Sequence, residues 1–319
     1  MVKSEVRDSA GISILDVTIR DGGYVNGHSW TLGEAAGIVR AVAQAGVQFA
    51  EVGYLRGEEA DPLRPSATCR PEYLEALAAE AGRTELAVMV RPGDVAPERL
   101  KDLRAHGIGM VRLLIPRLDV ERAAPYLDAA LAAGLKLAVN LTHVSRTDPA
   151  ELALAAERAA GRGAAYVYLA DSNGSLYPDD VAVRCRAVVE ALAGSDVTVG
   201  FHPHDNLGLA FANTRAAIAA GAGAVDASIG GIGKGGGNLR LELIAAHLTV
   251  HGGADFRLEP LLQDRTTHAA RLRMLADGTG GTLVAGLLDV GLDQARQLQE
   301  QAVQDGYDAL LRNGLRIAS

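Results

Sequence analysis

The sequence predicts an α/β fold, a closed (β/α)₈ TIM barrel with a C-terminal helical extension. Three observations predict it. Short apolar runs alternate with Ala-rich amphipathic segments in units of about 30 residues, the pattern of a parallel sheet with crossover helices. Several amphipathic segments end in an Ala-Gly step, a usual helix stop. Polar residues follow directly after the apolar runs, where a barrel of this kind carries its active site.

Eight segments are apolar throughout and rich in Val, Ile or Leu, as strands buried on both faces are. The expected strands are residues 12–18, 47–53, 85–91, 109–115, 135–141, 164–170, 197–202 and 224–229. Helical spacing follows them, for example at residues 32–45, 71–81 and 205–220. A doubly wound open sheet is the competing arrangement, but it usually has a Gly-rich dinucleotide turn after its first strand. Here that turn reads Arg20-Asp21-Gly22-Gly23-Tyr24, which does not match.

The pattern changes after the eighth unit, so we expect a catalytic barrel over residues 1–252 and a helical extension over residues 253–319. Residues 260–275 and 292–313 have helical spacing and are joined by a loose stretch at 277–282. The extension is expected to pack over the barrel, cover the active site or bind a partner.

Composition excludes several classes of function. The chain has 319 residues, of which 48% are hydrophobic, and a net charge of −8 without a basic cluster, which argues against nucleic-acid binding. No apolar run approaches the ~18 residues of a membrane span, and the N-terminus shows no secretory signal. Two cysteines, Cys69 and Cys185, fit a reduced cytoplasmic enzyme better than a disulfide-bonded secreted protein.

The strongest chemical signal is a pair of histidines, His202 and His204, at the end of the seventh strand. Residues two apart on a strand project to the same side, and Asp21 ends the first strand, which is close by in a closed barrel. Two neutral imidazoles and one carboxylate leave coordination positions open for water and substrate. We therefore expect one divalent ion, Mn²⁺ first, with Mg²⁺, Co²⁺, Zn²⁺ or Fe²⁺ as alternatives. Otherwise the histidines are ordinary loop residues and Asp21 pairs locally with Arg20.

Further polar residues stand at other strand ends. Arg20 would clamp a carboxylate or stabilise an enolate oxygen. Glu51 is a charge inside an apolar strand, and is expected to pair with Arg20 or Arg91 or to support the site. Arg91 is expected to bind a substrate carboxylate or to lie on the surface. Four more residues could face the site or only shape its turns: Asn140, His143, Asp171 and Ser172.

A glycine run, Gly-Gly-Ile-Gly-Lys-Gly-Gly-Gly-Asn at residues 230–238, follows the eighth strand. Such a loop lets the backbone approach a ligand closely, although a flexible turn is the simpler reading. It lacks the Gly-Lys-Ser/Thr order of a nucleotide-binding P-loop. Asn238 is a candidate fourth metal ligand or a support for the other ligands.

Four motifs together resemble the hydroxymethylglutaryl-CoA lyase-like superfamily of metal-dependent lyase and aldolase barrels. Residues 14–22 resemble its Asp-x-Thr-x-Arg-Asp-Gly signature, and residues 200–206 resemble its Gly-x-His-x-His-x-(Asn/Asp) motif. Residues 169–174 are similar to its Asp-Ser/Thr-x-Gly turn, and residues 225–238 to its last strand and glycine loop. The resemblance covers about residues 12 to 250 and is nearest to the 4-hydroxy-2-oxovalerate aldolases.

The resemblance implies that Asp21, His202 and His204 bind the metal and that Arg20 stabilises the enolate oxygen. It implies reversible aldol cleavage of a substrate into a pyruvate-type enolate and an aldehyde. Aldolases of this group carry a catalytic His three residues after the metal Asp, where this chain has Tyr24. The general base is therefore open among Tyr24, His28, His143 and Tyr307.

Two other functions remain open. A Claisen-type acyltransferase would join an acyl-CoA to a 2-oxo acid, and CoA release would reveal it. A partner-dependent or degenerate subunit is conceivable because the family His is missing. The lyase acting on hydroxymethylglutaryl-CoA is disfavoured because residues 230–238 contain no Cys. We expect a small-molecule 2-oxo acid and aldehyde as ligands, a homo-oligomer, and a dehydrogenase that docks through the C-terminal helices.

Overall fold

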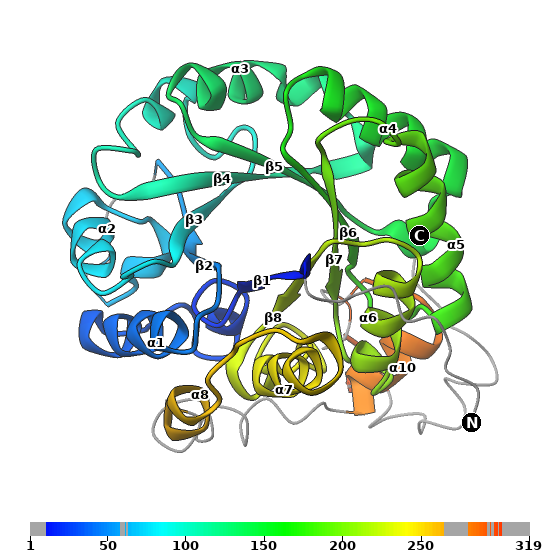
Figure 1. Cartoon of the computed structure of the whole chain (residues 1–319). Helices are drawn as coiled ribbons and strands as arrows, with labels where there is room; N and C mark the ends of the chain where they lie inside the picture. The colour runs from blue at the N-terminus through cyan, green and yellow to red at the C-terminus, as the bar shows by residue number, and fades with distance from the viewer. Residues whose placement is uncertain are drawn as a thin grey trace.

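The chain forms a closed barrel of eight parallel strands, which confirms the predicted fold class (Figure 1). The computed structural model describes residues 11–57, 61, 63–264, 280–291, 294, 297, 298, 300 and 301. Each strand pairs with the next along the chain, and β1 closes the barrel against β8, with Ser13 opposite Ala224. The strands are β1 (Ser13–Asp16), β2 (Phe49–Tyr54), β3 (Glu85–Val90), β4 (Ile108–Ile115), β5 (Lys136–Leu141), β6 (Tyr166–Asp171), β7 (Thr198–Pro203) and β8 (Ala224–Ala227).

Helices surround the barrel and cover the outer face of its strands (Figure 1). They are α1 (Leu32–Gln44), α2 (Pro71–Ala78), α3 (Ala124–Ala132), α4 (Pro149–Gly161), α5 (Pro178–Ala191), α6 (Ala210–Ala219) and α7 (Leu241–Gly252). Short 3₁₀ turns lie between them, at Gly22–Tyr24, Pro65–Ala67, Pro97–Leu100, Pro116–Leu118, Glu121–Ala123, Val144–Arg146 and Ile229–Gly231.

Local capping residues set where two of these helices begin. Thr31 and Glu34 form a capping box that starts α1 at its predicted residue. The helix predicted from residue 205 begins only at Ala210, so that prediction was wrong at its start. The carboxylate of Asp205 accepts a hydrogen bond from the Ala210 N–H at 2.8 Å, which holds the preceding residues in a turn.

Two helices of the expected C-terminal extension are described, α8 (Glu259–Asp264) and α10 (Gly280–Leu287). The segment before α8 packs beside α1, since the Arg257 N–H donates to the Ala45 carbonyl at 3.0 Å. The predicted loose stretch at 277–282 was wrong at its end, because Gly280 already starts a helix. Residues 265–275 of the first predicted helix, most of the second, and Tyr307 lie outside the described residues. The boundary at residue 252 coincides with the end of α7 and stays a prediction.

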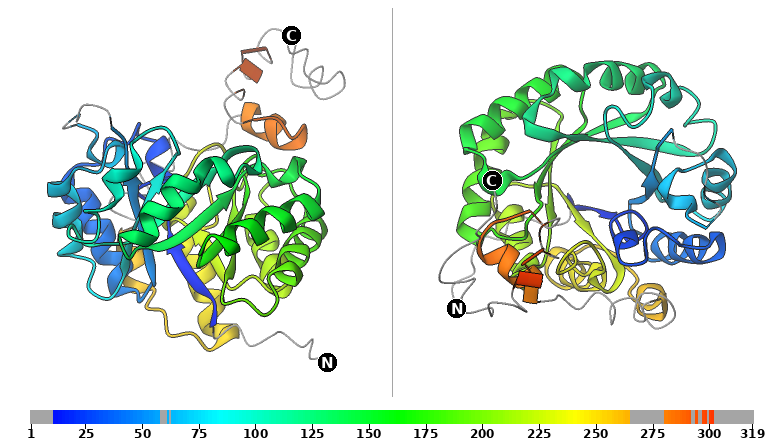
Figure 2. Two further views of the ribbon diagram at one scale, coloured as in Figure 1. Left: turned by 90° about the horizontal axis from the view of Figure 1, so that it is seen from above. Right: turned by 180° about the vertical axis from the view of Figure 1, so that it is seen from behind.

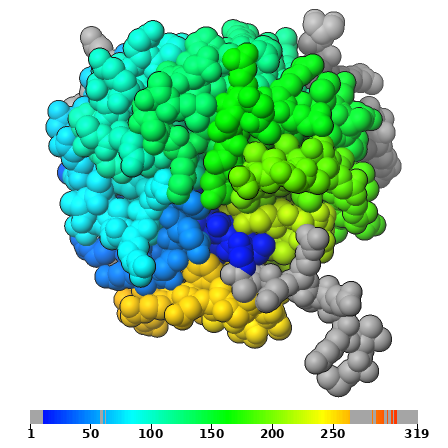
Figure 3. Space-filling model, turned by 45° about the horizontal axis from the view of Figure 1, so that its top comes forward, coloured from blue at the N-terminus to red at the C-terminus, as the bar shows by residue number. Residues whose placement is uncertain are grey.

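The two ends of the barrel carry different parts of the chain. Figure 3 shows the end at which the strands begin, with the first described residues, in dark blue, at its centre and the gold segment of α8 along one edge. In the left view of Figure 2, α10 lies at the other end, where the strands finish. The carboxyl ends of the strands are where a barrel of this type binds its ligands.

Side chains from alternate strands fill the barrel interior in layers, as expected for this fold. The even-numbered strands supply a lower layer in the buried interior cluster: Phe49, Met110, Tyr166 and Ala224. Two residues further along the same strands, the next layer is polar and consists of Glu51, Arg112, Tyr168 and Asp226, all almost completely buried. The interior therefore changes from apolar to charged directly beneath the carboxyl ends of the strands.

Two expectations from composition can be compared with the described residues. Cys69 and Cys185 are both free thiols and both buried, in agreement with a reduced protein. Among the described helices, none combines the length and the apolar character that crossing a membrane requires.

Candidate active site

A cavity of about 340 Å³ opens at the carboxyl ends of the strands. Its walls come from the last residues of the strands or from the loops after them, and Gly291, four residues beyond α10, completes the lining. Nine residues predicted from the sequence line it: Arg20, Asp21, Tyr24, Arg91, Asn140, His143, Ser172, His202 and His204. The barrel thus brings most of the predicted site to one place.

Asp21, His202 and His204 form the group of side chains most suited to a metal ion. One ligand atom from each lies within 4.8 Å of the others, and all three residues are buried. The Nε2 atom of His202 is 3.9 Å from Oδ2 of Asp21. Carboxylate and imidazole donors in this number leave room for further ligands on a divalent ion.

Hydrogen bonds fix the orientation of both imidazoles. His202 donates from Nδ1 to the carboxylate of Asp226 at 2.8 Å, and His204 donates from Nδ1 to the Gly237 carbonyl at 3.2 Å. Since a carboxylate and a carbonyl only accept, each Nδ1 carries the proton and each Nε2 keeps its lone pair. Metal-binding histidines are held in the same way in other proteins.

The charge states of the cluster also suit a cation. Burial lowers the pKa of His204 to about 4, which leaves its imidazole neutral at pH 7. Burial would raise the pKa of Asp21, but the Arg20 guanidinium and the two histidines outweigh it and hold that pKa well below its usual value. The Oδ1 atom of Asn238 is buried without a hydrogen-bond partner among the described residues, while its Nδ2 donates to Asp21 at 3.1 Å. The residues present therefore fit a divalent ion.

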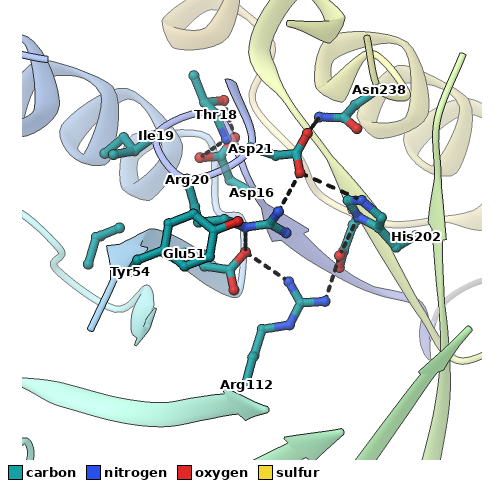
Figure 4. A network of polar contacts seen from close by, with 12 residues as sticks. Asp16, Thr18, Ile19, Arg20, Asp21, Glu51, Tyr54, Arg112, His202 and Asn238 are labelled. Atoms are coloured by element: carbon teal, nitrogen blue, oxygen red, sulfur yellow. Dashed lines mark hydrogen bonds and ion pairs between the residues drawn. The ribbon is translucent and has the colours of Figure 1, made fainter. Parts of the chain in front are cut away.

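A chain of buried charges connects the cluster to the layer beneath it (Figure 4). Arg20 pairs with Asp21 through Nη1 and with Glu51 through Nε, the latter at 2.6 Å. Arg112 donates to Glu51 at 3.1 Å and to Asp226 at 2.6 Å, and Asp226 in turn holds His202. Positive and negative groups thus alternate from Asp21 around to the imidazole opposite it.

The glycine run allows the close approach that its composition predicted. A Cβ at Gly233 would lie 2.2 Å from Nδ2 of Asn238 and 3.0 Å from Oδ1 of Asp21. Gly237 has φ +95°, and a Cβ there would lie 2.3 Å from the Gly231 carbonyl oxygen. Only glycine fits at both positions, so this loop can wrap the cluster tightly and present the Gly237 carbonyl to His204.

Comparison with known proteins agrees with this site. The model of the family described as HMGL-like matches residues 118–273. A 4-hydroxy-2-oxovalerate aldolase from Thermus thermophilus is 38% identical over 242 residues, which cover 75% of this chain and 69% of that protein. An oxaloacetate decarboxylase from Mycobacterium tuberculosis is 33% identical over 264 residues, 82% of this chain and 76% of that protein. The chain belongs to the HMGL-like family.

A solved structure shares the fold of this HMGL-like barrel. The carboxyl transferase domain of Rhizobium etli pyruvate carboxylase superposes with a TM-score of 0.75 at 19% identity, covering 96% of this chain and 55% of that one. The family model and the aldolase relatives confirm the resemblance predicted from the four motifs, including its nearness to the 4-hydroxy-2-oxovalerate aldolases.

Four predicted site residues do not line the cavity of this family member. Glu51 was expected to pair with Arg20 or Arg91 or to support the site; it is fully buried and bonded to Arg20 and Arg112. Asp171 accepts the Ser175 and Leu176 N–H groups and shapes the turn after β6. His28 is buried behind the cavity wall. Asn238 lies in the glycine loop and contacts the cluster through a hydrogen bond from its Nδ2 to Asp21.

Sequence reasoning missed several residues of the site. Tyr54 and Lys234 line the cavity, and Arg112 and Asp226 support it from below. The signal that singled out Glu51, a charge within an apolar strand, was equally present at Arg112 and Asp226. Tyr54 had no such signal, because a tyrosine is ordinary in a strand.

Three aromatic rings gather at one wall of the cavity. The hydroxyl of Tyr24 lies 2.9 Å from that of Tyr54, and the His28 ring packs edge-on against both. Burial lowers the pKa of His28 to about 4 and raises the pKa of Tyr54 well above its usual value. Tyr54 therefore stays protonated at neutral pH and can donate its hydrogen bond to Tyr24.

Asp289, just after α10, anchors the C-terminal segment to the mouth of the cavity. Its Oδ1 accepts hydrogen bonds from Ser145 and Asn173 at 2.8 Å and from Ser175 at 2.7 Å. Arg146 adds an ion pair at 3.3 Å. These partners follow β5 and β6, and Gly291 lines the cavity two residues later, so the anchor places this segment over the site.

Asp289→Ala is expected to release this segment. The loss of a charged acceptor for three hydrogen bonds should weaken the free energy of docking of this segment by about 2 kcal/mol or more. The hydrogen-exchange rate of the Val290 amide should then rise at least roughly tenfold. That amide donates to Ala285 in the docked segment. Asp128→Ala removes an exposed carboxylate on α3 and serves as the control. Equal exchange in both variants would contradict the anchoring role.

The same anchor should depend on pH. Burial would raise the pKa of Asp289, but hydrogen bonds from Asn173, Ser175 and Ser145 outweigh it and the pKa is lowered. A lowered folded-state pKa means that the docking contribution is complete above the ordinary aspartate value of about 3.9 and is lost as the pH falls through the lowered one. Protection of the Val290 amide should accordingly hold at pH 5 to 7 and fall only in stronger acid.

Proposed function

We propose that this HMGL-like protein is a divalent-metal-dependent aldolase, which reversibly cleaves a 4-hydroxy-2-oxo acid into pyruvate and an aldehyde. The observation that carries the proposal is the convergence of Asp21, His202 and His204 within 4.8 Å beside Arg20 in one cavity. Relatives named as an aldolase and as a decarboxylase of 2-oxo acids support the same chemistry.

Asp21, His202 and His204 would hold the ion, with Asn238 as a neighbour whose amide could turn its oxygen inward. A divalent ion bound there supplies Lewis-acid polarisation of the substrate's 2-oxo group. His202 and His204 each present Nε2, and the hydrogen bonds at Nδ1 keep the rings in that position.

Arg20 is positioned to stabilise negative charge on the substrate. Its Nε and Nη1 atoms are committed to Glu51 and Asp21, while Nη2 has no hydrogen-bond partner among the described residues. A guanidinium held by two carboxylates needs no reorganisation as an enolate oxygen develops beside it. Arg91, Asn140 and Ser172 line the same cavity and would bind the rest of the substrate.

Tyr24 is the general base that the geometry favours. It lines the cavity at the position where the family aldolases carry a histidine, and its side chain is 41% exposed. The Tyr24 hydroxyl lies 2.9 Å from that of Tyr54, which can donate a hydrogen bond to it, and the Lys234 ammonium lies 5.6 Å from the Tyr24 ring centre. His28 lies off the cavity, and Tyr307 lies outside the described residues.

Tyr24→Phe is expected to lower kcat for aldol cleavage by about 10²- to 10⁴-fold, the usual effect of losing a general base. Tyr54→Phe should cost roughly tenfold, because it removes only one hydrogen bond to that base. Tyr177→Phe, at an exposed tyrosine, is the matched control. A large loss in His143→Asn together with an active Tyr24→Phe would assign the base to His143 instead.

The activity is tested by pyruvate release from 4-hydroxy-2-oxovalerate in the presence of Mn²⁺, Mg²⁺, Co²⁺ or Zn²⁺. We expect equal amounts of pyruvate and acetaldehyde, with Mn²⁺ the most active ion. CoA release from acetyl-CoA plus a 2-oxo acid would instead identify a Claisen-type acyltransferase. A protein that neither binds the ion nor releases either product would be the partner-dependent or degenerate subunit, which has no need of the Asp and His set.

Three finer predictions accompany the proposal. The protein is proposed to act in the cytoplasm, as a homo-oligomer, and with a dehydrogenase that consumes the aldehyde. Cys69 and Cys185, both free, are consistent with a reducing compartment. The dehydrogenase would dock on residues 253–319, of which the structure describes only part.

A further inference from the structure

A second cavity, of about 300 Å³, adjoins the first at the carboxyl ends of β3 and β4. Arg91 and Pro116 line both cavities, so the two spaces meet at a shared wall. A substrate that reaches beyond Arg91 from the metal cluster would enter this second space.

The second cavity is positively charged although the protein as a whole carries −8. Arg91, Arg117 and Arg122 line it, against one acid, Asp119. Oδ1 of Asp119 accepts the backbone N–H of Arg122 at 3.1 Å. None of the three guanidinium groups forms an ion pair or side-chain hydrogen bond with another described residue, and all three arginines are exposed.

The backbone around Arg117 is held in an unfavourable conformation. Arg117 has φ +55° and the next residue, Leu118, has φ +56°, both in the left-handed region that non-glycine residues rarely adopt. Two such residues in succession persist only where the surrounding structure imposes them, and they gather at ligand-binding loops. The unfavourable backbone at Arg117 and Leu118 must therefore be offset by contacts elsewhere in the fold.

The place of the loop in the barrel indicates which end of a substrate it meets. Arg91 follows β3, which is opposite β7, the strand that contains His202 and directly precedes His204. A 2-oxo acid bound at the metal cluster would therefore extend its other end, the aldehyde portion, toward the arginines. Guanidinium groups bind carboxylates and phosphates through paired hydrogen bonds.

We propose that Arg91, Arg117 and Arg122 form a subsite for an anionic group, a carboxylate or a phosphate, on the aldehyde portion of the substrate. This inference rests on the proposed aldolase function and narrows its substrate class. The physiological aldehyde then carries a negative charge, and neutral aldehydes such as acetaldehyde are poorer substrates.

Condensation of pyruvate with three aldehydes tests the subsite: acetaldehyde, succinic semialdehyde with a carboxylate, and glycolaldehyde phosphate. Arg117→Ala and Arg122→Ala change residues that line only the second cavity. Each should lower kcat/KM for the anionic aldehyde that the wild type prefers by roughly ten- to one-hundred-fold and leave acetaldehyde within about twofold. Arg99→Ala, at an exposed arginine outside both cavities, is the control. The preferred anion distinguishes carboxylate from phosphate.

A binding measurement separates failure of the subsite from failure of the proposed activity. Metal-free protein is titrated with succinate and with inorganic phosphate by calorimetry, and the Arg117→Ala/Arg122→Ala double variant should lose at least tenfold in affinity for the one that binds. Two results would overturn the subsite alone. One is wild-type aldol activity without a preference for charged aldehydes, and the other is an equal loss of kcat/KM on all three aldehydes in the arginine variants. Anion binding that depends on these arginines without any aldol product overturns the aldolase and keeps the subsite.

Discussion

Asp21→Asn is expected to abolish tight binding of a divalent ion and to lower the rate of aldol cleavage by about 10³-fold or more. The substitution keeps the shape of the side chain but replaces the one anionic ligand of the cluster by a neutral amide. Removal of metal from the wild type with a chelator should produce the same loss of rate. Both changes remove the positive charge of the ion from beside the 2-oxo group. Elemental analysis and kcat, measured before and after adding Mn²⁺, check both results.

The matched control is Asp196→Ala, an exposed aspartate in the loop before β7. It should retain the ion and the activity of the wild type. Metal-free protein with full activity, or an Asp21→Asn variant that keeps one tightly bound ion, would remove the basis of the proposed mechanism.

Arg112→Met is expected to destabilise the folded protein by about 3–5 kcal/mol, the cost of leaving buried charges without their partner. Arg112 and Glu51 are both 0% exposed, and Arg112 forms ion pairs with both Glu51 and Asp226. Methionine fills most of the space that Arg112 occupied. Glu51 then keeps only its ion pair with Arg20, and Asp226 keeps only its hydrogen bond from His202. The free energy of unfolding, measured in urea, should show the full loss.

Two further variants distinguish a charge effect from a packing effect. Arg40→Met breaks a surface pair with Glu80, where the Arg40 side chain is 52% exposed, and should cost less than about 1 kcal/mol. Adding Glu51→Gln to Arg112→Met removes one of the stranded charges and should restore part of the stability. If Arg112→Met costs no more than Arg40→Met, the buried charge layer contributes nothing to folding.

The strands and the core of the candidate metal site could be predicted because their signals are local. Each strand is a short apolar run, and the two-residue spacing alone predicts that His202, in β7, and His204, directly after it, project to the same side. The carboxyl ends of parallel strands meet at one end of a barrel, so Asp21 was expected beside them. The family motifs are equally local, and the comparisons agree with them.

What the sequence determined by itself is therefore the order of strands, the closed parallel barrel and the candidate ligand set at its mouth, because each motif is local and a parallel barrel brings the carboxyl ends of its strands together. Only the tertiary structure decided the partners of those residues. Arg112 lies 61 residues from Glu51 and 114 from Asp226, and Ser145 lies 144 residues from Asp289. Such contacts follow from barrel closure and helix docking, which place side chains by three-dimensional packing. No spacing along the chain encodes that geometry, which is why His28 lies behind the cavity wall while Tyr54 lines the cavity.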